Sequence, residues 1–312
     1  MSNNTNSSEN DYKRAILTKA VWMYYIEGMT QKDIAEAIGT TRLKVIKMLE
    51  EARNKNLIQF HIPVLDREKI EIEHKLTEKF GLKDVFIVST NTQENTNESI
   101  AQAAAMYIND LIKENTFINM GYGDTLGRVL NNLANISEKR LSIISLTGGV
   151  APYLPNSSTN IFNAQLYLLP TPLLMSSAET AQNILLEKPV KDIFEMSNLS
   201  SISVVGIGGM NEEATIMKSN ILSNNEFIKL KMKGAVGDIL MHFVNEQGEL
   251  IDSEIESKLV STSLEKLKEL NNVIAVAAGI EKIEAIKAGL LGGYINTLIT
   301  DETTAKYLIK ED

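Results

Sequence analysis

Three short glycine-containing segments each follow an apolar stretch that could form a strand. Glycine allows close backbone approach, so N–H groups can surround an anion, and a helix that begins there presents its positive end to the same ligand. The segment 121–125 also opens a predicted helix and adds a threonine hydroxyl. Tight strand-to-helix turns are the alternative interpretation. The residues predicted to bind an anionic ligand in these segments are Gly121, Gly123, Asp124, Thr125, Thr147, Gly148, Gly149, Gly206 and Gly208.

Two charged residues lie where a bound ligand would explain them. Asp238 lies in the otherwise apolar segment 235–241, and a buried carboxylate is costly without a partner. Lys282 lies at the start of a predicted helix, where a cation is unfavourable unless an anion is nearby. An aspartate that orients a loop and a solvated lysine are the alternatives. Asp238 and His242 are also four residues apart, so they could form an acid–base pair.

The first 62 residues contain a pattern typical of a helix-turn-helix. Ala35, Gly39 and Val45 stand at spacings of four and six residues, which suits a close helix crossing, a turn with positive φ and an anchor for the second helix. The outer face of that second helix is polar and basic, as base edges and phosphates require. A bundle with solvated basic residues is the alternative. The residues predicted to contact DNA are Thr30, Gln31, Thr40, Thr41, Arg42, Lys44 and Lys47.

Composition excludes several classes of protein. The 312 residues include no cysteine and three histidines, which excludes disulfide scaffolds, thiolate nucleophiles and cysteine-ligated metals, and we predict no metal site. No apolar run approaches the roughly 18 residues of a membrane span, so we expect no membrane partner and a cytoplasmic protein. The net charge of −9 is uneven, because residues 1–62 carry nine basic and seven acidic side chains, and residues 63–312 carry 22 and 33.

Apolar segments alternate with helical periodicities over the rest of the chain. Strands are predicted at 85–89, 116–121, 141–146, 165–169, 201–206, 273–278 and 296–300. Helices are predicted at 98–113, 124–135, 178–198, 211–230, 263–270, 281–290 and 302–309. This alternation indicates an α/β fold with a mainly parallel sheet covered on both faces. Ligands of such sheets bind beyond the C-terminal ends of the strands, where the glycine-containing segments fall.

The chain is expected to divide into four parts. They are a disordered polar tail (1–11), a winged helix-turn-helix domain (12–62, with 57–62 as the wing), a linker helix (63–80) and a ligand-binding domain (81–312). The linker helix carries a single apolar stripe, which favours either oligomerisation or packing onto its own domain. Trp22, Tyr24 and Tyr25 are expected in the core of the N-terminal domain.

The N-terminal pattern resembles the SorC family of sugar-responsive bacterial transcription regulators. The similar segments there are 20–39, 41–42, 45–49, 52–53 and 57–62. Further similar segments follow in the family's order at 122–125, 147–149, 169–172, 234–238, 277–282 and 298–302. The resemblance covers about residues 12–309. Leu43 stands where the family usually has proline, Asn56 and Ile280 where it usually has glycine, and Thr147 replaces a lysine that could form a Schiff base in some members.

The resemblance implies a Rossmann-like domain similar to sugar-phosphate isomerases and aminosugar-phosphate deaminases. It implies a phosphorylated sugar as effector, no cofactor, double-stranded operator DNA as partner, and a homo-oligomer, either a dimer or a tetramer. Asp238 would bind sugar hydroxyls, Lys282 would bind the phosphate, and Gln165 is predicted to face the same pocket.

The sequence thus predicts a DNA-binding transcription regulator, a repressor, whose operator binding a phosphorylated sugar modulates. The alternative is a sugar-phosphate isomerase or deaminase with a regulatory headpiece, in which Asp238 and His242 would act. A base, an acid and an electrophilic group cannot all be assigned from the sequence, so we predict no catalytic residue and no enzymatic activity.

Overall fold

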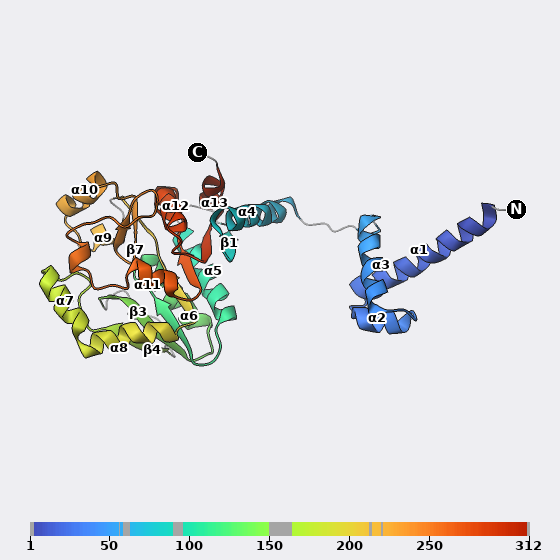
Figure 1. The fold of residues 1–312 in the computed structure, drawn as a ribbon, viewed down its shortest axis with the longest axis horizontal. Helices are drawn as coiled ribbons and strands as arrows, with labels where there is room; N and C mark the ends of the chain where they lie inside the picture. Colours follow the sequence, from blue (N-terminus) through green and yellow to red (C-terminus); the bar gives the residue numbers. More distant parts are fainter. Residues whose placement is uncertain are drawn as a thin grey trace. The chain divides into compact units, whose positions relative to one another are not determined.

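The computed structural model describes residues 3–55, 57–58, 63–89, 96–149, 164–211, 214–219 and 221–310 (Figure 1). The chain forms two compact units, Met1–Asp66 and Arg67–Asp312, which are described separately below. Among the described residues, no helix combines the length and apolar character needed to cross a membrane.

The N-terminal unit is a three-helix domain that contains α1 (Asn3–Tyr25), α2 (Gln31–Ala37) and α3 (Arg42–Asn54). The hydroxyl of Thr30 caps α2 by accepting a hydrogen bond from the Asp33 N–H, and Thr41 caps α3 in the same way. Gly39 has a φ of +67° in the turn between α2 and α3. The positive φ predicted for this turn is therefore confirmed.

The core of this unit contains the residues that the helix-turn-helix pattern selects. Ala35 and Val45 are buried, and they cluster with apolar residues of all three helices. Tyr24 and Tyr25 pack against this cluster. The expectation for Trp22 was wrong, because its side chain is 56% exposed and its indole N–H donates to the Glu27 carboxylate at 3.0 Å.

The ends of the N-terminal unit differ from the prediction or lie outside the described residues. Helix α1 begins at Asn3, whereas residues 1–11 were expected to be disordered. Elongating a helix adds one hydrogen bond for each residue, so a polar segment can continue a helix that packing has nucleated further along. Residues 57 and 58 form bends, and residues 59–62 of the predicted wing are not described.

The larger unit is built on a seven-stranded parallel sheet with the order β1-β10-β9-β5-β2-β3-β4. The strands are β1 (Asp84–Val88), β2 (Thr116–Met120), β3 (Leu141–Gly148), β4 (Ala164–Leu169), β5 (Ile202–Val205), β9 (Val273–Val276) and β10 (Thr297–Asp301). All seven predicted strands are confirmed. Strands β3 and β4 follow β2 on one side of the sheet, and the next strand in the chain, β5, pairs with β2 on its other side. The direction in which strands are added therefore reverses between β2 and β5.

Helices cover both faces of this sheet, as the alternating pattern predicts. Successive residues of β9 point to opposite faces of the sheet. Ala275 packs with α4, α11, α12 and α13 on one face, and Ile274 packs with α5 and α6 on the other. The helices are α4 (Val64–Phe80), α5 (Thr96–Leu111), α6 (Asp124–Ile136), α7 (Ala178–Leu186), α8 (Lys188–Met196), α9 (Thr215–Lys218), α10 (Asn224–Met232), α11 (Leu264–Glu269), α12 (Ile283–Leu291) and α13 (Glu302–Ile309). Asp301 caps α13 through the N–H groups of Thr303 and Thr304.

Helix α4 corresponds to the predicted linker helix, and its C-terminal part packs onto the larger unit. Ile72 and Leu76 are buried in the cluster under β1. The Glu73 carboxylate accepts a hydrogen bond from the Ile87 N–H at 2.8 Å, and burial raises the pKa of that carboxyl. Val64 and Ile70 remain exposed. The two compact units divide at Asp66, inside α4, so the structure favours packing for the second half of this helix.

A second sheet, which the sequence did not predict, lies beside the first. It is antiparallel and contains β6 (Gly208–Gly209), β7 (Gly237–Ile239) and β8 (His242–Val244). Strands β7 and β8 form a hairpin whose two turn residues, Leu240 and Met241, have φ values of 54° and 73°. Positive φ is unusual for large side chains, so the hairpin tip is a strained segment.

Candidate functional site

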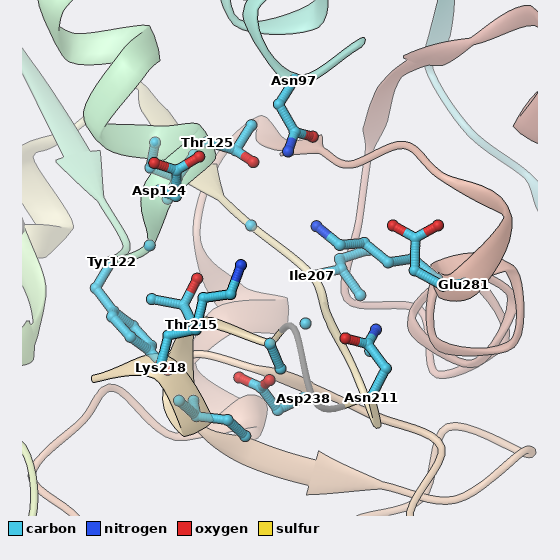
Figure 2. Close-up of a pocket in the computed structure, with 18 of the residues that line it drawn as sticks. Asn97, Tyr122, Asp124, Thr125, Ile207, Asn211, Thr215, Lys218, Asp238 and Glu281 are labelled. Atoms are coloured by element: carbon cyan, nitrogen blue, oxygen red, sulfur yellow. The ribbon is translucent and has the colours of Figure 1, made fainter. Parts of the chain in front are cut away.

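The largest group of the predicted binding residues lines one cavity of about 630 Å³ at the C-terminal ends of β2, β5 and β9 (Figure 2). This volume suits a small organic ligand, for which pockets usually enclose about 300–1,000 Å³. The predicted residues on its wall are Gly123, Asp124, Thr125, Gly206, Gly208, Asp238 and Lys282. Segments that lie far apart in the sequence thus meet where the switch in strand order predicts a ligand.

The N-terminus of α6 forms one wall of the cavity. Gly123 is its N-cap residue with a φ of +127°, and no side chain caps the helix. The first N–H groups of a helix have no partner inside the helix, so they present a partial positive charge to the cavity. The Asp124 carboxylate is held by the Arg128 guanidinium at 2.9 Å, and Arg128 also pairs with Glu98. A phosphate would therefore meet backbone donors and the Thr125 hydroxyl here.

Lys282 supplies a cation on another wall. It is half-buried at the junction of a short 3₁₀ turn (Ile280–Lys282) and α12. Burial lowers the pKa of its ammonium group, and the nearby carboxylates of Glu281 and Asp238 oppose that shift. Within the described part of the chain, its ammonium group forms no hydrogen bond or ion pair. An anionic ligand would supply the missing partner.

Asp238 forms the floor of the cavity and is 5% exposed. Burial raises its pKa from 3.8 to about 6, against the opposing effects of the Met241 N–H, Lys282 and His242. Strand β6 pairs directly with β7 at Gly208 and Asp238. A Cβ atom at Gly208 would overlap the Asp238 carboxylate, so this glycine is required by the aspartate rather than by a phosphate.

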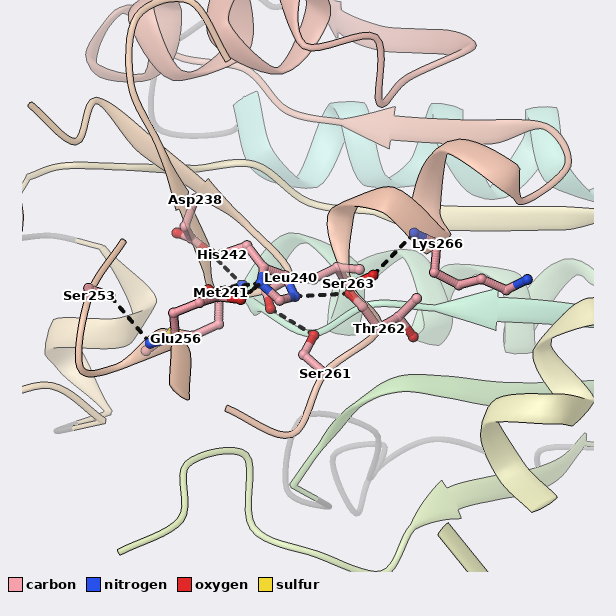
Figure 3. Close-up of polar contacts among 10 residues, drawn as sticks. All are labelled: Asp238, Leu240, Met241, His242, Ser253, Glu256, Ser261, Thr262, Ser263 and Lys266. Atoms are coloured by element: carbon pink, nitrogen blue, oxygen red, sulfur yellow. Dashed lines mark hydrogen bonds and ion pairs between the residues drawn. The ribbon is translucent and has the colours of Figure 1, made fainter. Parts of the chain in front are cut away.

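A buried network holds the hairpin that carries Asp238 (Figure 3). His242 Nδ1 lies 2.9 and 3.0 Å from the two Glu256 carboxylate oxygens, and its Nε2 lies 2.9 Å from the Thr262 carbonyl. The Ser261 hydroxyl donates to the Leu240 carbonyl at 2.9 Å. These contacts tie the strained tip to residues 256–262, so they stabilise the position of Asp238.

Five predicted binding residues lie outside the cavity. The backbone donors of Gly148 and Gly149 are already bonded to the carbonyls of Val260 and Thr171, and Thr147 is buried in a bridge with Ser261. These residues therefore do not form a phosphate loop, because the N–H groups of Gly148 and Gly149 already donate hydrogen bonds to backbone carbonyls. Gln165 is exposed near the start of β4, opposite to the strand ends that form the cavity. Gly121 lies below the cavity, where a Cβ would meet the Leu240 side chain.

Several lining residues were missed by the sequence analysis. Asn97 is the second residue of α5, Asn211 lies two residues after β6, and Lys218 is the last residue of α9. The Oδ1 atom of Asn211 is buried with no hydrogen-bond partner in the described structure, so it can accept a hydrogen bond from a ligand. The signal for these residues was weak, because they follow strand ends by several residues in segments without a recognisable motif.

The predicted DNA-contacting residues gather at the start of α3 and α2. Arg42 lies beside Gln31, whose amide oxygen accepts from the Arg42 Nε at 3.3 Å, and Lys44 and Lys47 are exposed on α3. Arg42 and Gln31 lie with Thr30 along an open groove. The hydroxyls of Thr30 and Thr41 are engaged as caps, and Thr40 is half-buried. The basic side chains are therefore better placed than the three threonines to contact DNA.

The known proteins that are similar to this chain over most of its length are sugar-binding domains and transcription regulators. Residues 67–310 match the family described as "Putative sugar-binding domain". Transcriptional regulator LsrR from Enterobacter sp. (strain 638) is 33% identical over 298 residues, which cover 94% of this chain and 92% of the relative. LsrR from Escherichia coli O157:H7 is 31% identical over the same length. The chain belongs to the SorC family of sugar-binding transcription regulators.

Solved structures of other transcription regulators have the same fold. The full-length sorbitol operon regulator SorC from Klebsiella pneumoniae superposes with a TM-score of 0.68 at 24% identity, covering 95% of this chain and 98% of that one. A transcriptional regulator from Streptococcus pneumoniae TIGR4 gives 0.69 at 23% identity, covering 78% and 98%. The α/β fold predicted from the sequence is therefore confirmed.

The position of His242 corrects one part of the sequence analysis. The acid–base pair of the enzyme alternative would need Asp238 and His242 in one site. Asp238 faces the cavity from β7, whereas both ring nitrogens of His242 bond to Glu256 and Thr262. In this SorC-family member Ile239 pairs with His242 across the hairpin, so Asp238, one residue earlier, points to the opposite face. His242 does not line the cavity that Asp238 faces. The relatives compared above are transcription regulators.

The raised pKa of Asp238 predicts how stability depends on pH. The pKa of Asp238 is about 6 in the folded chain and 3.8 ordinarily. Between pH 3.8 and about 6 the carboxyl is therefore protonated in the folded chain and ionised in the unfolded chain. This contribution to the free energy of unfolding is complete below about pH 4 and is lost as the pH rises through about 6. We expect wild type to lose on the order of 3 kcal/mol relative to Asp238→Asn over that range.

Denaturant unfolding of both proteins without effector, between about pH 4 and 7, measures this difference. The asparagine variant keeps the shape of the protonated carboxyl, and groups that do not interact with Asp238 titrate equally in both proteins. A stability difference that does not change with pH would show that Asp238 stays ionised and would contradict the predicted shift.

Proposed function

We propose that this regulator binds operator DNA through its N-terminal unit and that a phosphorylated sugar in the cavity of the larger unit modulates this binding. The observation that carries the proposal is the convergence of Lys282, the uncapped N-terminus of α6 and Asp238 on one cavity. The first two suit a phosphate dianion, and the carboxylate accepts hydrogen bonds from sugar hydroxyls. LsrR relatives and sugar-binding domains support the same assignment.

Further features of the proposal follow from the charge of the N-terminal part. A net charge of +2 in residues 1–62 gives weak binding for a single copy, because affinity grows with the number of neutralised phosphates. We propose a homo-oligomer, a dimer or a tetramer, that holds several headpieces in register on one operator in the cytoplasm. Release of a repressor from the operator is the proposed direction of the sugar-phosphate effect.

A ligand screen and a DNA selection test this function. In a thermal-shift screen, we expect at least one phosphorylated sugar to raise the melting temperature, because a ligand that binds only the folded state stabilises it. The unphosphorylated form of the same sugar is the control and should have little effect. Selection from random duplexes should enrich one sequence. Equal shifts with both sugars would refute the phosphate assignment, and failure to enrich any sequence would refute the regulator.

A further inference from the structure

The outward face of α3 carries an apolar patch that the DNA-contact prediction omitted. Val45 and Leu49 point into the core of the N-terminal unit. With 3.6 residues per turn, the opposite side of the helix is centred near Leu43 and Lys47, and Ile46 lies beside Leu43 on the flank of that side. Leu43 is 64% exposed and Ile46 is 37% exposed, although each offers only apolar surface. Single exposed aliphatic residues are common, so their place on the helix decides what they do.

That place is the part of a helix-turn-helix that reads base edges. Side chains near the N-terminus of the second helix enter the major groove, and Leu43 is the second residue of α3. Three cations, Arg42, Lys44 and Lys47, lie around the patch, and one carboxylate, Glu50, lies one turn beyond Ile46, so the net charge around the patch is positive. Cations in this arrangement match the phosphates on both sides of a groove, whereas a second copy of the same face would bring like charges together. The charges thus favour a duplex as the occupant.

The apolar group available in the major groove is the C5-methyl of thymine. An aliphatic side chain cannot satisfy the donors and acceptors of the other bases, so burying it against them leaves polar groups unpaired. We infer that Leu43, with Ile46 beside it, contacts thymine methyl groups and makes thymine a required base in each half-site. This inference rests on the proposed DNA-binding function.

Replacing thymine by deoxyuridine tests the inference, because the exchange removes only the methyl group. In the operator selected above, each thymine is replaced in turn, and affinity is measured by fluorescence anisotropy with the full-length protein at fixed salt. We expect about a fourfold loss of wild-type affinity at one or two positions of each half-site, from burial of one methyl. Leu43→Ala should bind the thymine and deoxyuridine operators equally.

Matched variants separate this role from a general effect. Ile26 is a comparably exposed aliphatic residue beyond the end of α1, and Ile26→Ala should discriminate thymine from deoxyuridine as wild type does. Wild-type protein that binds every substituted operator equally would overturn the inference, and so would a Leu43→Ala variant that still discriminates. Loss of self-association in Leu43→Ala, with discrimination unchanged, would assign the patch to a second copy instead. Failure of wild type to select any DNA would overturn the DNA-binding function itself.

Discussion

Replacing Lys282 by alanine should abolish the response to the sugar phosphate and leave operator binding intact. Its ammonium group is half-buried, has a pKa lowered by desolvation, and faces the cavity without an ion-pair partner among the described residues. Removing one member of a desolvated charge pair typically costs about 2–5 kcal/mol. We therefore expect sugar-phosphate affinity to fall by roughly 30-fold to several thousand-fold.

Calorimetric titration measures this loss, and operator binding is checked with the same preparation. Lys229→Ala is the matched control, because Lys229 is an exposed lysine of the same unit on α10, outside the cavity. The control should bind the sugar phosphate as wild type does. If the Lys282→Ala variant responds normally, the phosphate does not lie at this wall of the cavity.

The reverse pattern is expected for Arg42→Ala, which should lose operator binding and keep sugar-phosphate binding. Arg42 is exposed at the first position of α3, and its Nε donates a hydrogen bond to the amide oxygen of the half-buried Gln31. A good contact to a base is worth about 1–3 kcal/mol in each half-site. With two headpieces on one operator, affinity should fall by roughly 30-fold to roughly 20,000-fold.

Arg53→Ala provides the matched control for this prediction. Arg53 carries the same charge on the same helix, but it lies in the last turn of α3. It should reduce affinity only slightly and equally for all sequences, because a distant cation contributes at most to phosphate attraction. Equal losses for Arg42→Ala and Arg53→Ala would mean that the start of α3 does not read the operator.

The sequence predicts the main sheet well because its strands are buried on both faces. Segments such as 273–278 are continuous apolar runs between helical patterns, and few other structures produce that alternation. Lys282 and Asp238 were also identified, since each is a charge that the local structure alone does not explain. These features are local, so the sequence carries them directly.

The features that were missed depend on contacts between distant segments. Gly148 resembles a ligand loop in sequence, yet its N–H bonds to Val260, more than a hundred residues away. The hairpin turns through Leu240 and Met241, which carry no turn signal, and its strands have only three residues each. Tertiary packing decides both, and neither periodicity nor residue type reports it.

Anisotropy of the selected operator, titrated with the full-length protein at fixed salt, tests the central claim most directly. The titration is repeated with the sugar phosphate that stabilises the protein and with its unphosphorylated form. An effector that couples two sites typically changes affinity by about 5- to 150-fold. We predict that the sugar phosphate weakens operator binding within that range and that the unphosphorylated sugar does not. An unchanged operator affinity with the bound sugar phosphate would contradict the account.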